Sequence, residues 1–473
     1  MSLRDKAFTY IKKYGILIMI AEIVGITAAI IYICCNQAVH WDEAYTYRIV
    51  TQFSVVDMIK ETAADIHPPL YYLLVKVCTL FFGTDLMVFK LFSVLCTVAT
   101  MVLGITLVRK RWGGQVAFLF IMVCGLGPQF IYFAVDVRMY ALEMFFVTAC
   151  GLLAYEIILE NGRRDWILFT ISALGGAYTH YFSIVPLAII YGFLFIWGIV
   201  KNRKAIRRFV VCCICTVLGY LPWLFVVLQS FEAQGTTGEV NLLLFDLKGL
   251  VEWAFTNNIE FSAYMPVVLY LLALVLLVVR RKQMSFEKLL FQVMCAVNWV
   301  ISYLLCLVIA SMSEHFWDNR YIYGSLGLFW LFLFISIIEQ KKETFYGLSV
   351  WLTIMVLSAF TVQKSRELGT IEYVNAAHEV LKQVEDEEIL LYNFPTYNVL
   401  WEYHVPGKEF IYIDDIDPNK IEGNYIYMIA WGGRDFPQSV YDEFYIFIDD
   451  CGEMQFEEGV AGVRLYKVRF QKK

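Results

Sequence analysis

The chain has 473 residues, of which 59% are hydrophobic and 17% are charged, with a formal net charge of −6. An average globular domain carries about 25% charged residues, so this composition predicts a polytopic membrane protein. The sequence has no basic face and no RNA- or DNA-binding motif, which excludes a nucleic-acid partner.

The first apolar segment, Ile16 to Cys35, is long enough to cross a bilayer. The basic residues before it are not followed by a small-residue cleavage site, so we expect a retained anchor rather than a removed signal peptide. After it comes a polar loop, residues 36–85, in which Asp42 and Glu43 emerge at a membrane surface and Asp65 and His67 precede a double proline. Carboxylates beside hydrocarbon are costly and mark ion paths or catalytic sites, although simple solvation is the alternative for Asp42 taken alone.

Ten further apolar segments have the length of membrane spans: 86–108, 115–135, 139–159, 166–179, 183–200, 209–230, 263–279, 289–311, 321–339 and 344–363. The stretch from Pro68 to Phe82 is shorter and has Lys76 at its centre. A spanning helix needs about 20 apolar residues, so we expect this stretch to lie in the membrane interface. Eleven spans with interfacial helices then form the domain of residues 1–363.

Basic clusters set the orientation, because cytoplasmic loops carry an excess of Lys and Arg. The six clusters are Arg4 to Lys13, Arg109 to Arg111, Arg163-Arg164, Lys201 to Arg208, Arg280 to Lys282 and Lys341-Lys342. If Pro68 to Phe82 does not cross the membrane, all six clusters and the N-terminus lie in the cytoplasm. The outer side then receives Asp42, Glu43, Asp65, His67, Asp136, Arg138, His180, Tyr181, the loop from Phe231 to Glu260, and Glu314 to Arg320. A transporter should instead show polar residues at mid-membrane depth, so this distribution favours an enzyme at the outer surface.

The composition changes after Gln363, and residues 364–473 are expected to form a small extracytoplasmic α/β domain. Helical periodicity runs from Glu372 to Asp386. Strand candidates rich in Ile, Tyr, Phe and Val follow at Glu388 to Phe394, Glu409 to Ile413, Tyr425 to Ala430, Glu443 to Ile448 and Gly462 to Phe470.

The outer residues have the chemistry for transferring a group from a phosphate-linked donor. A carboxylate such as Asp42 can accept the proton of the nucleophile, and cations can stabilise the departing phosphate. Arg138 and Arg320 suit a phosphate because the guanidinium fork binds two oxygens at once. For Arg320, an ordinary snorkelling anchor is the alternative, and snorkelling explains Lys90 as well as a phosphate contact does.

A divalent metal is a chemically reasonable cofactor at the same face, because His67 and His180 stand near carboxylates such as Glu43. The alternative for each histidine is an interfacial hydrogen-bonding residue. Tyr321 is a further candidate for binding the donor phosphate, beside Arg320. Asp65, Asp136, Tyr140 and Tyr181 are other site candidates, since they share this face.

Ordered pieces of the sequence resemble the GT-C membrane glycosyltransferases of the protein O-mannosyltransferase and aminoarabinose-transferase type. The pieces are Trp41-Asp42-Glu43-Ala44-Tyr45, His67-Pro68-Pro69-Leu70-Tyr71-Tyr72, Arg138-Met139-Tyr140-Ala141-Leu142, Thr179-His180-Tyr181-Phe182 and Arg320-Tyr321. The resemblance implies a polytopic GT-C fold and a cell-envelope enzyme that moves a sugar from a polyprenyl-phosphate donor to a lipid, glycan or protein acceptor, with inversion at the anomeric carbon. It also implies that Asp42 is the base, that the arginines hold the lipid phosphate, and that a metal site lies near His67.

Two other classes of function stay open at this point. A transporter or lipid flippase would need polar residues within the spans, and a non-catalytic glycan-binding protein would leave the Asp42 cluster without a role. An inverting enzyme needs one carboxylate when the leaving group is a phosphate, whereas a retaining glycosidase needs a nucleophile opposite an acid.

Overall fold

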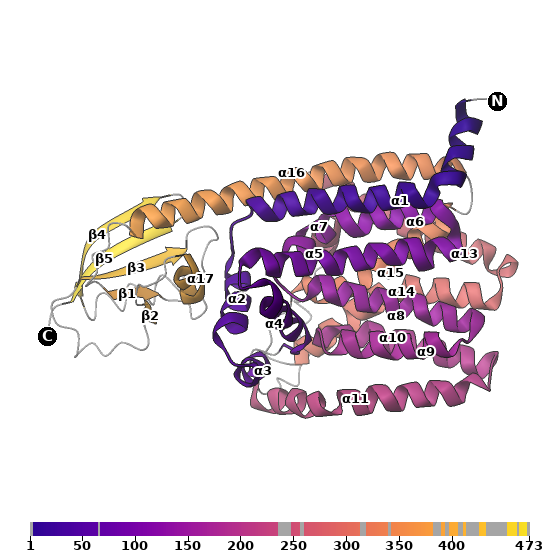
Figure 1. Ribbon diagram of the computed structural model, residues 1–473, viewed down its shortest axis with the longest axis horizontal. Coiled ribbons are helices and arrows are strands. Elements are labelled where there is room, and N and C mark those ends of the chain that lie inside the picture. The colour runs from indigo at the N-terminus through magenta and orange to yellow at the C-terminus, as the bar shows by residue number, and fades with distance from the viewer. Residues whose placement is uncertain are drawn as a thin grey trace. The chain divides into compact units, whose positions relative to one another are not determined.

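The structure is a computed structural model, and it describes residues 3–64, 67–234, 247–255, 260–312, 318–338, 342–381, 389–392, 397–404, 410–412, 425–431, 452–460 and 463–470 (Figure 1). The chain divides into two compact units. The first comprises Met1–Cys35 and Val50–Gln363, and the second comprises Asn36–Ile49 and Lys364–Lys473. The loop that carries Asp42 and Glu43 therefore belongs to the same unit as the C-terminal residues.

The first unit is helical, and its long helices lie side by side along a common direction (Figure 1). Its helices are α1 (Leu3–Asn36), α3 (Val55–Ala64), α4 (Leu70–Phe82), α5 (Leu86–Leu103), α6 (Arg109–Leu126), α7 (Pro128–Val135), α8 (Tyr140–Glu160), α9 (Arg163–Ala177), α10 (Ile184–Val200), α11 (Ala205–Gln234), α12 (Leu247–Phe255), α13 (Glu260–Arg280), α14 (Phe286–Met312) and α15 (Leu326–Ile338). The helix α16 (Lys342–Leu381) belongs to this unit as far as Gln363. Short helical turns lie at η1 (Gly104–Val108), η2 (Tyr181–Ser183), η4 (Arg281–Gln283) and η5 (Asn319–Ser325).

Nine helical segments among the described residues are long and apolar enough to cross a membrane. One of them, Leu86–Leu126, has 41 residues, about twice the number that a single crossing needs. Gly113 breaks this segment with a φ of 86°, and Gly104 packs against Phe120 and Ile121 on the other side of the break. The segment is therefore a hairpin of two antiparallel helices. The expected span at 166–179 corresponds to α9, whose 15 residues fall below the length of these nine.

Two helices form the centre of the first unit. All residues of α15 are buried, and so are most of those of α8. Glycines permit the close approach of these two helices: a Cβ at Gly151 of α8 would meet the side chain of Leu328, and one at Gly327 would meet Thr148. The turn that leads into α8 therefore opens onto the best-packed part of the molecule.

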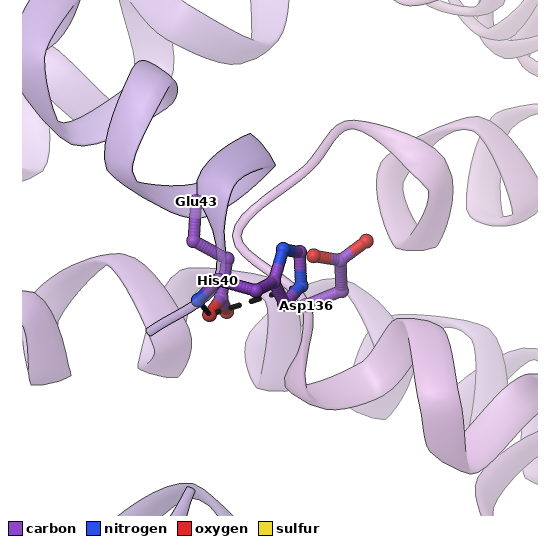
Figure 2. Close-up of side chains that lie close together, drawn as sticks. All are labelled: His40, Glu43 and Asp136. Carbon is purple, nitrogen blue, oxygen red and sulfur yellow. Dashed lines mark hydrogen bonds and ion pairs between the residues drawn. The ribbon is translucent and has the colours of Figure 1, made fainter. Parts of the chain in front are cut away.

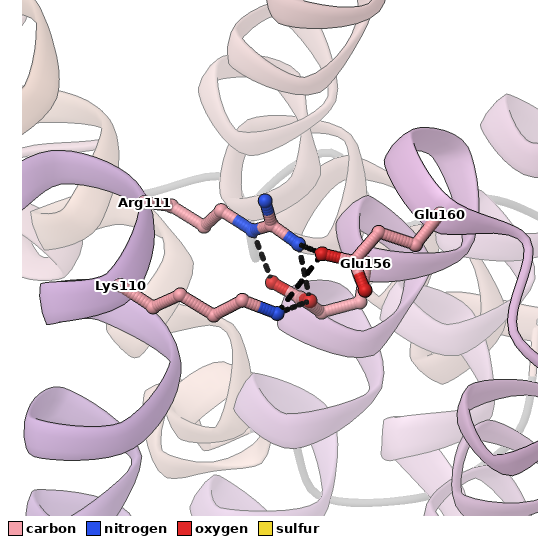
Figure 3. A network of polar contacts seen from close by, with 4 residues as sticks. All are labelled: Lys110, Arg111, Glu156 and Glu160. Atoms are coloured by element: carbon pink, nitrogen blue, oxygen red, sulfur yellow. Dashed lines mark hydrogen bonds and ion pairs between the residues drawn. The ribbon is translucent and has the colours of Figure 1, made fainter.

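The far end of α8 carries an ion-pair network (Figure 3). Lys110 Nζ lies 2.7 Å from Glu156 Oε2 and 3.0 Å from Glu160 Oε1, and Arg111 Nε lies 2.5 Å from Glu156 Oε1. Arg111 also pairs with Glu160. Since α8 has 21 residues, this network is about 25 Å from the helix start, at 1.5 Å per residue.

The helix α4 is the stretch that was expected to lie in the interface. Its 13 residues measure about 20 Å, shorter than the 30 Å core of a bilayer. The ammonium of Lys76 donates to the carbonyl oxygens of Val50 and Phe53, at 2.6 and 2.7 Å. These carbonyls belong to the C-terminal end of α2 (Trp41–Gln52), where a helix has acceptors without intrahelical donors and favours a cation. Lys76 thus fixes the end of the helix that begins with the acidic pair.

The second unit contains a five-stranded sheet with the order β2-β1-β3-β5-β4. Its strands are β1 (Ile389–Tyr392), β2 (Phe410–Tyr412), β3 (Tyr425–Trp431), β4 (Gly452–Val460) and β5 (Val463–Phe470). β1 pairs in parallel with both β2 and β3, and β5 pairs antiparallel with β3 and β4. The helix α17 (Tyr397–His404) connects β1 to β2, as in a βαβ unit.

Four of the five expected strands are present at these positions, and the fifth, Glu443 to Ile448, lies outside the described residues. The sequence did not indicate α17 or β4. The helix expected from Glu372 is the end of α16, which continues without interruption from the last apolar segment to Leu381.

Candidate active site

The turn between α7 and α8 holds the first pair of charged site residues. α7 ends at Asp136, which is extended (φ −78°, ψ 135°), and α8 begins at Tyr140. The side chains of Asp136 and Arg138 are both buried, with 4% and 3% of their surfaces exposed. Asp and Arg are almost never buried to this degree unless they are paired. The burial of both charged side chains therefore indicates a polar site inside the protein.

Arg138 is paired with His67, which precedes α4. The Nη2 atom of Arg138 lies 3.2 Å from Nε2 of His67. A guanidinium has donors only, so Nε2 accepts and the neutral ring carries its proton on Nδ1. The lone pair of Nε2 is thus used by Arg138, and the contact fixes one side of the guanidinium fork.

A second histidine lies against a carboxylate that the sequence did not single out. Nδ1 of His180 lies 3.6 Å from Oε1 of Glu143, and both side chains are buried. Neither oxygen of Glu143 has a hydrogen-bond partner among the described residues. Gly324 leaves the space for this carboxylate, because a Cβ there would lie 2.8 Å from Oε1. A buried carboxylate without a hydrogen bond carries a large desolvation cost, which marks Glu143 as a functional candidate.

Arg320 and its neighbour Tyr321 lie in the same neighbourhood. Cζ of Arg320 is 5.8 Å from the ring centroid of Tyr140, within the range of a cation–π contact. The Tyr321 ring stacks on Phe182 at 5.0 Å and lies 5.5 Å from the His180 ring. Asp318 anchors the arginine, with Oδ2 at 3.2 Å from Nε. The structure therefore brings together Tyr140, His180, Arg320 and Tyr321.

Three other predicted site residues have different surroundings. Lys90 of α5 is 1% exposed, so it is enclosed by protein and is not a lysine that snorkels to a surface. The hydroxyl of Tyr181 accepts a hydrogen bond from Nε1 of Trp223 at 3.0 Å, within a cluster that includes Tyr220 and Ala177. Tyr181 is thus occupied in aromatic packing. Asp65 lies outside the described residues.

In the second unit, the acidic pair begins α2. Asp42 and Glu43 stand in the first turn of this helix, where the helix dipole favours negative charge. Glu43 is fully buried, and its Oε2 accepts from the backbone N–H of His40 at 3.3 Å (Figure 2). The imidazole Nε2 of His40 lies 3.8 Å from the same oxygen. Glu43 is therefore held by the residue that precedes the helix, whereas Asp42 is buried beside it.

One pair of donors within the second unit suits a divalent cation. His40 and Glu43, both labelled in Figure 2, offer an imidazole and a carboxylate. Divalent metals in proteins take such ligands. His67 and His180, which the sequence suggested as ligands, have one ring nitrogen each against Arg138 and Glu143 instead.

Two of these residues were missed in the sequence. His40 precedes Glu43 by three residues, so it stands one helical turn away, and this spacing is the available signal. Glu143 stands in the first turn of an otherwise apolar span, and an acidic residue at such a place is itself a signal.

The sequence matches no family model and no curated protein. The structure does match solved proteins. The crystal structures of ArnT from Cupriavidus metallidurans in the apo state and bound to undecaprenyl phosphate each align with a TM-score of 0.59. Each alignment covers 95% of this chain and 97% of that chain. The chain has the ArnT fold.

Sequence identity to these two structures is 10% and 11%, so the likeness concerns the fold. The alignment extends over nearly the whole of both chains. The GT-C fold that the ordered sequence pieces implied is thereby confirmed. A multi-pass helical membrane protein agrees with both the composition and the nine membrane-length segments of the described chain.

Proposed function

We propose that this protein is an inverting glycosyltransferase that moves a sugar from a polyprenyl-phosphate donor to a hydroxyl or amine acceptor. The observation that carries the proposal is the buried Arg138, held by His67 at the start of the central helix, in a chain with the fold of ArnT. One of the ArnT structures contains undecaprenyl phosphate. A long-chain polyprenyl phosphate carrier is thus the donor class that we propose for this chain.

Asp42 is the proposed base. The acceptor oxygen or nitrogen attacks the anomeric carbon, its proton passes to the Asp42 carboxylate, and the bond between that carbon and the phosphate oxygen breaks. The phosphate leaves with the electron pair, and this single displacement inverts the anomeric centre. A positioned base contributes about 10²–10⁴-fold to such a reaction.

Arg138 and Arg320 are the proposed phosphate ligands, with Lys90 and Tyr321 as further donor contacts. A phosphate gains charge as the bond to the sugar breaks, so a fixed guanidinium stabilises the transition state more than the ground state. The contact with His67 holds the Arg138 fork in one orientation before the donor binds. The assignment of Asp42 and the two arginines to one reaction rests on the family resemblance.

A divalent metal is part of the proposal. His40 and Glu43 are residues that we propose as its ligands, because their donor chemistry fits such a cation. When bound, the metal would neutralise negative charge near the donor phosphate. Glu43 and His40 already hold each other at the start of α2, so the ligand atoms of this pair need little reorganisation.

We propose that the reaction occurs at the outer face of the cell membrane, with the N-terminus in the cytoplasm and the C-terminal domain outside. The positive-inside distribution of basic clusters supports this orientation. Lys110 and Arg111, which the orientation places inside, lie at the end of α8 opposite to the turn with Arg138.

Incubation of membranes with a panel of labelled polyprenyl-phosphate sugars tests the proposal. Membranes that contain the protein should move one label to an acceptor of the cell envelope, and membranes with Asp42→Asn should not. Full transfer by the Asn variant would remove Asp42 from the mechanism. Movement of the intact labelled lipid across the membrane, without transfer of the sugar, would instead support a flippase.

A further inference from the structure

The acidic helix α2 touches the C-terminal domain at two places. Tyr47 of α2 meets Tyr403 of α17 edge to face, with ring centroids 5.1 Å apart and planes at 82°. Nε2 of His404 lies 3.1 Å from the carbonyl oxygen of Val39. A carbonyl only accepts, so His404 donates this hydrogen bond. All four residues belong to the same compact unit.

These contacts bracket the acidic pair. Val39 lies three residues before Asp42, and Tyr47 lies four residues after Glu43. One contact therefore fixes the chain as it enters α2, and the other fixes the second turn of the helix. Asp42 and Glu43 lie between two points that α17 holds.

The helix α17 is itself well placed to hold them. It connects β1 to β2, and β1 pairs with both β2 and β3 in the interior of the sheet. Both ends of α17 are thus tied to paired strands within a few residues. Val399 of this helix is buried, so α17 has a face that is covered by protein.

We propose that α17 is the support of the Asp42 helix, and that Tyr403 and His404 are positioning residues for the base. The C-terminal domain is then a working part of the transfer site and not an independent glycan-binding module. The geometric part of the inference stands on the contacts alone, whereas its catalytic consequence rests on the proposed function. A base has to lie within hydrogen-bond reach of the proton that it takes, so small displacements of α2 lower the rate.

Hydrogen exchange of the full-length protein in lipid nanodiscs tests the support directly. Peptides that cover residues 36–49 should exchange about two- to tenfold faster in Tyr403→Ala and in His404→Ala. An aromatic pair or a hydrogen bond stabilises the closed state by a free energy that corresponds to this factor. Tyr403→Phe keeps the ring edge and His404→Gln keeps a donor, so both should exchange like the parent protein.

Tyr346→Ala is the matched control. It removes a tyrosine from a similar edge contact, with Phe345 at 5.4 Å, in the first unit. Exchange in residues 36–49 should not change in this variant. Peptides from β3 and β5 report whether the domain stays folded. If Tyr403→Ala unfolds the domain, Tyr403→Leu, which keeps apolar bulk without the ring edge, decides the case.

Kinetics separate a positioning role from a general loss of stability. In Tyr403→Ala, kcat should fall while the KM for the lipid donor stays constant, and Tyr403→Phe should restore kcat. If residues 36–49 exchange at the parent rate in both alanine variants while the domain stays folded, α17 does not support α2. This conclusion holds whether or not the protein transfers a sugar. Faster exchange in a protein that transfers no sugar would instead uphold the support and overturn the proposed function.

Discussion

The guanidinium of Arg138 donates a hydrogen bond to Nε2 of His67, joining two residues that are 71 positions apart in the chain. The contact ties the turn before α8 to the double proline before α4. It also gives His67 a role that needs no metal, because the ring orients one side of the guanidinium. A buried fork held at one side presents its remaining donors in a fixed direction.

Arg138→Lys should therefore impair transfer although it keeps the charge. Lysine loses the planar fork, and the loss of charged hydrogen bonds of this type costs about 1.5–3 kcal/mol, or roughly 10- to 150-fold in rate. The defect should appear in the kinetics of the lipid donor. Arg164→Lys, an exposed arginine at the start of α9, is the control and should not change the rate. A defect confined to the acceptor would place Arg138 on the wrong side of the reaction.

Asp42→Asn should lower the rate of transfer by about 10²–10⁴-fold while leaving the fold intact, because the substitution keeps the shape of the side chain and removes the base. Glu43→Gln should be milder, since the amide oxygen can still accept from the N–H of His40. Turnover should be measured with saturating donor and acceptor. Asp57→Asn on α3 tests for a nonspecific effect of losing a carboxylate, because Asp57 is exposed. Equal losses in the Asp42 and Asp57 variants would contradict the assignment.

Much of the first unit could be predicted, because a pattern of long apolar segments and short basic loops fits few structures other than a bundle of membrane helices. Lys76 was the feature that set α4 apart in the sequence, and its physical role in the structure is to bond the carbonyls of Val50 and Phe53. The hairpin at Gly113 was also visible, as a basic cluster beside a double glycine. The sequence did not reveal the continuity of α16, because its polar second half and apolar first half have different compositions.

The site could be predicted in part. Tyr140, His180, Arg320 and Tyr321 were assigned to one face of the membrane from their motifs, and in the structure their side chains lie close together. Pairings between distant segments have no local signature, which is why the contacts of Glu143 with His180 and of His404 with Val39 were not foreseen. The strand β4 was missed because its acidic sequence lacks the apolar alternation that strands usually show.

Gly324→Ala should destabilise the protein, because the new methyl group would lie 2.8 Å from the buried carboxylate of Glu143. Overpacking of this kind costs about 1–3 kcal/mol. Gly347→Ala is the control, since nothing lies within 4 Å of a Cβ there and the position is within α16. Thermal unfolding of purified protein should show a lower midpoint only for the first variant. Equal midpoints for both would mean that Glu143 does not occupy the position described.

Metal removal should lower activity if the His40 and Glu43 side chains bind a cation. Exhaustive chelation of purified protein should stop transfer, and stepwise return of Mg²⁺ or Mn²⁺ should restore it. His40→Ala should need a higher metal concentration for half-restoration than the parent protein, whereas His67→Ala should not, because His67 Nε2 is bonded to Arg138. Unchanged turnover after chelation would remove the metal from the mechanism.

The topology can be tested at two turns, one just before α5 and the other at Gly113. If α4 does not cross the membrane, the turn before α5 faces outward and the turn at Gly113 faces the cytoplasm. Thr84 and Gly114 are exposed positions next to these turns, and a Cβ at Gly114 meets no atom within 4 Å. In a background without native cysteines, Thr84→Cys should react in intact cells with an impermeant maleimide. Gly114→Cys should react only after the membrane is opened. The reverse pattern would mean that α4 spans the bilayer, and it would move Arg138, His180 and Arg320 to the cytoplasmic side.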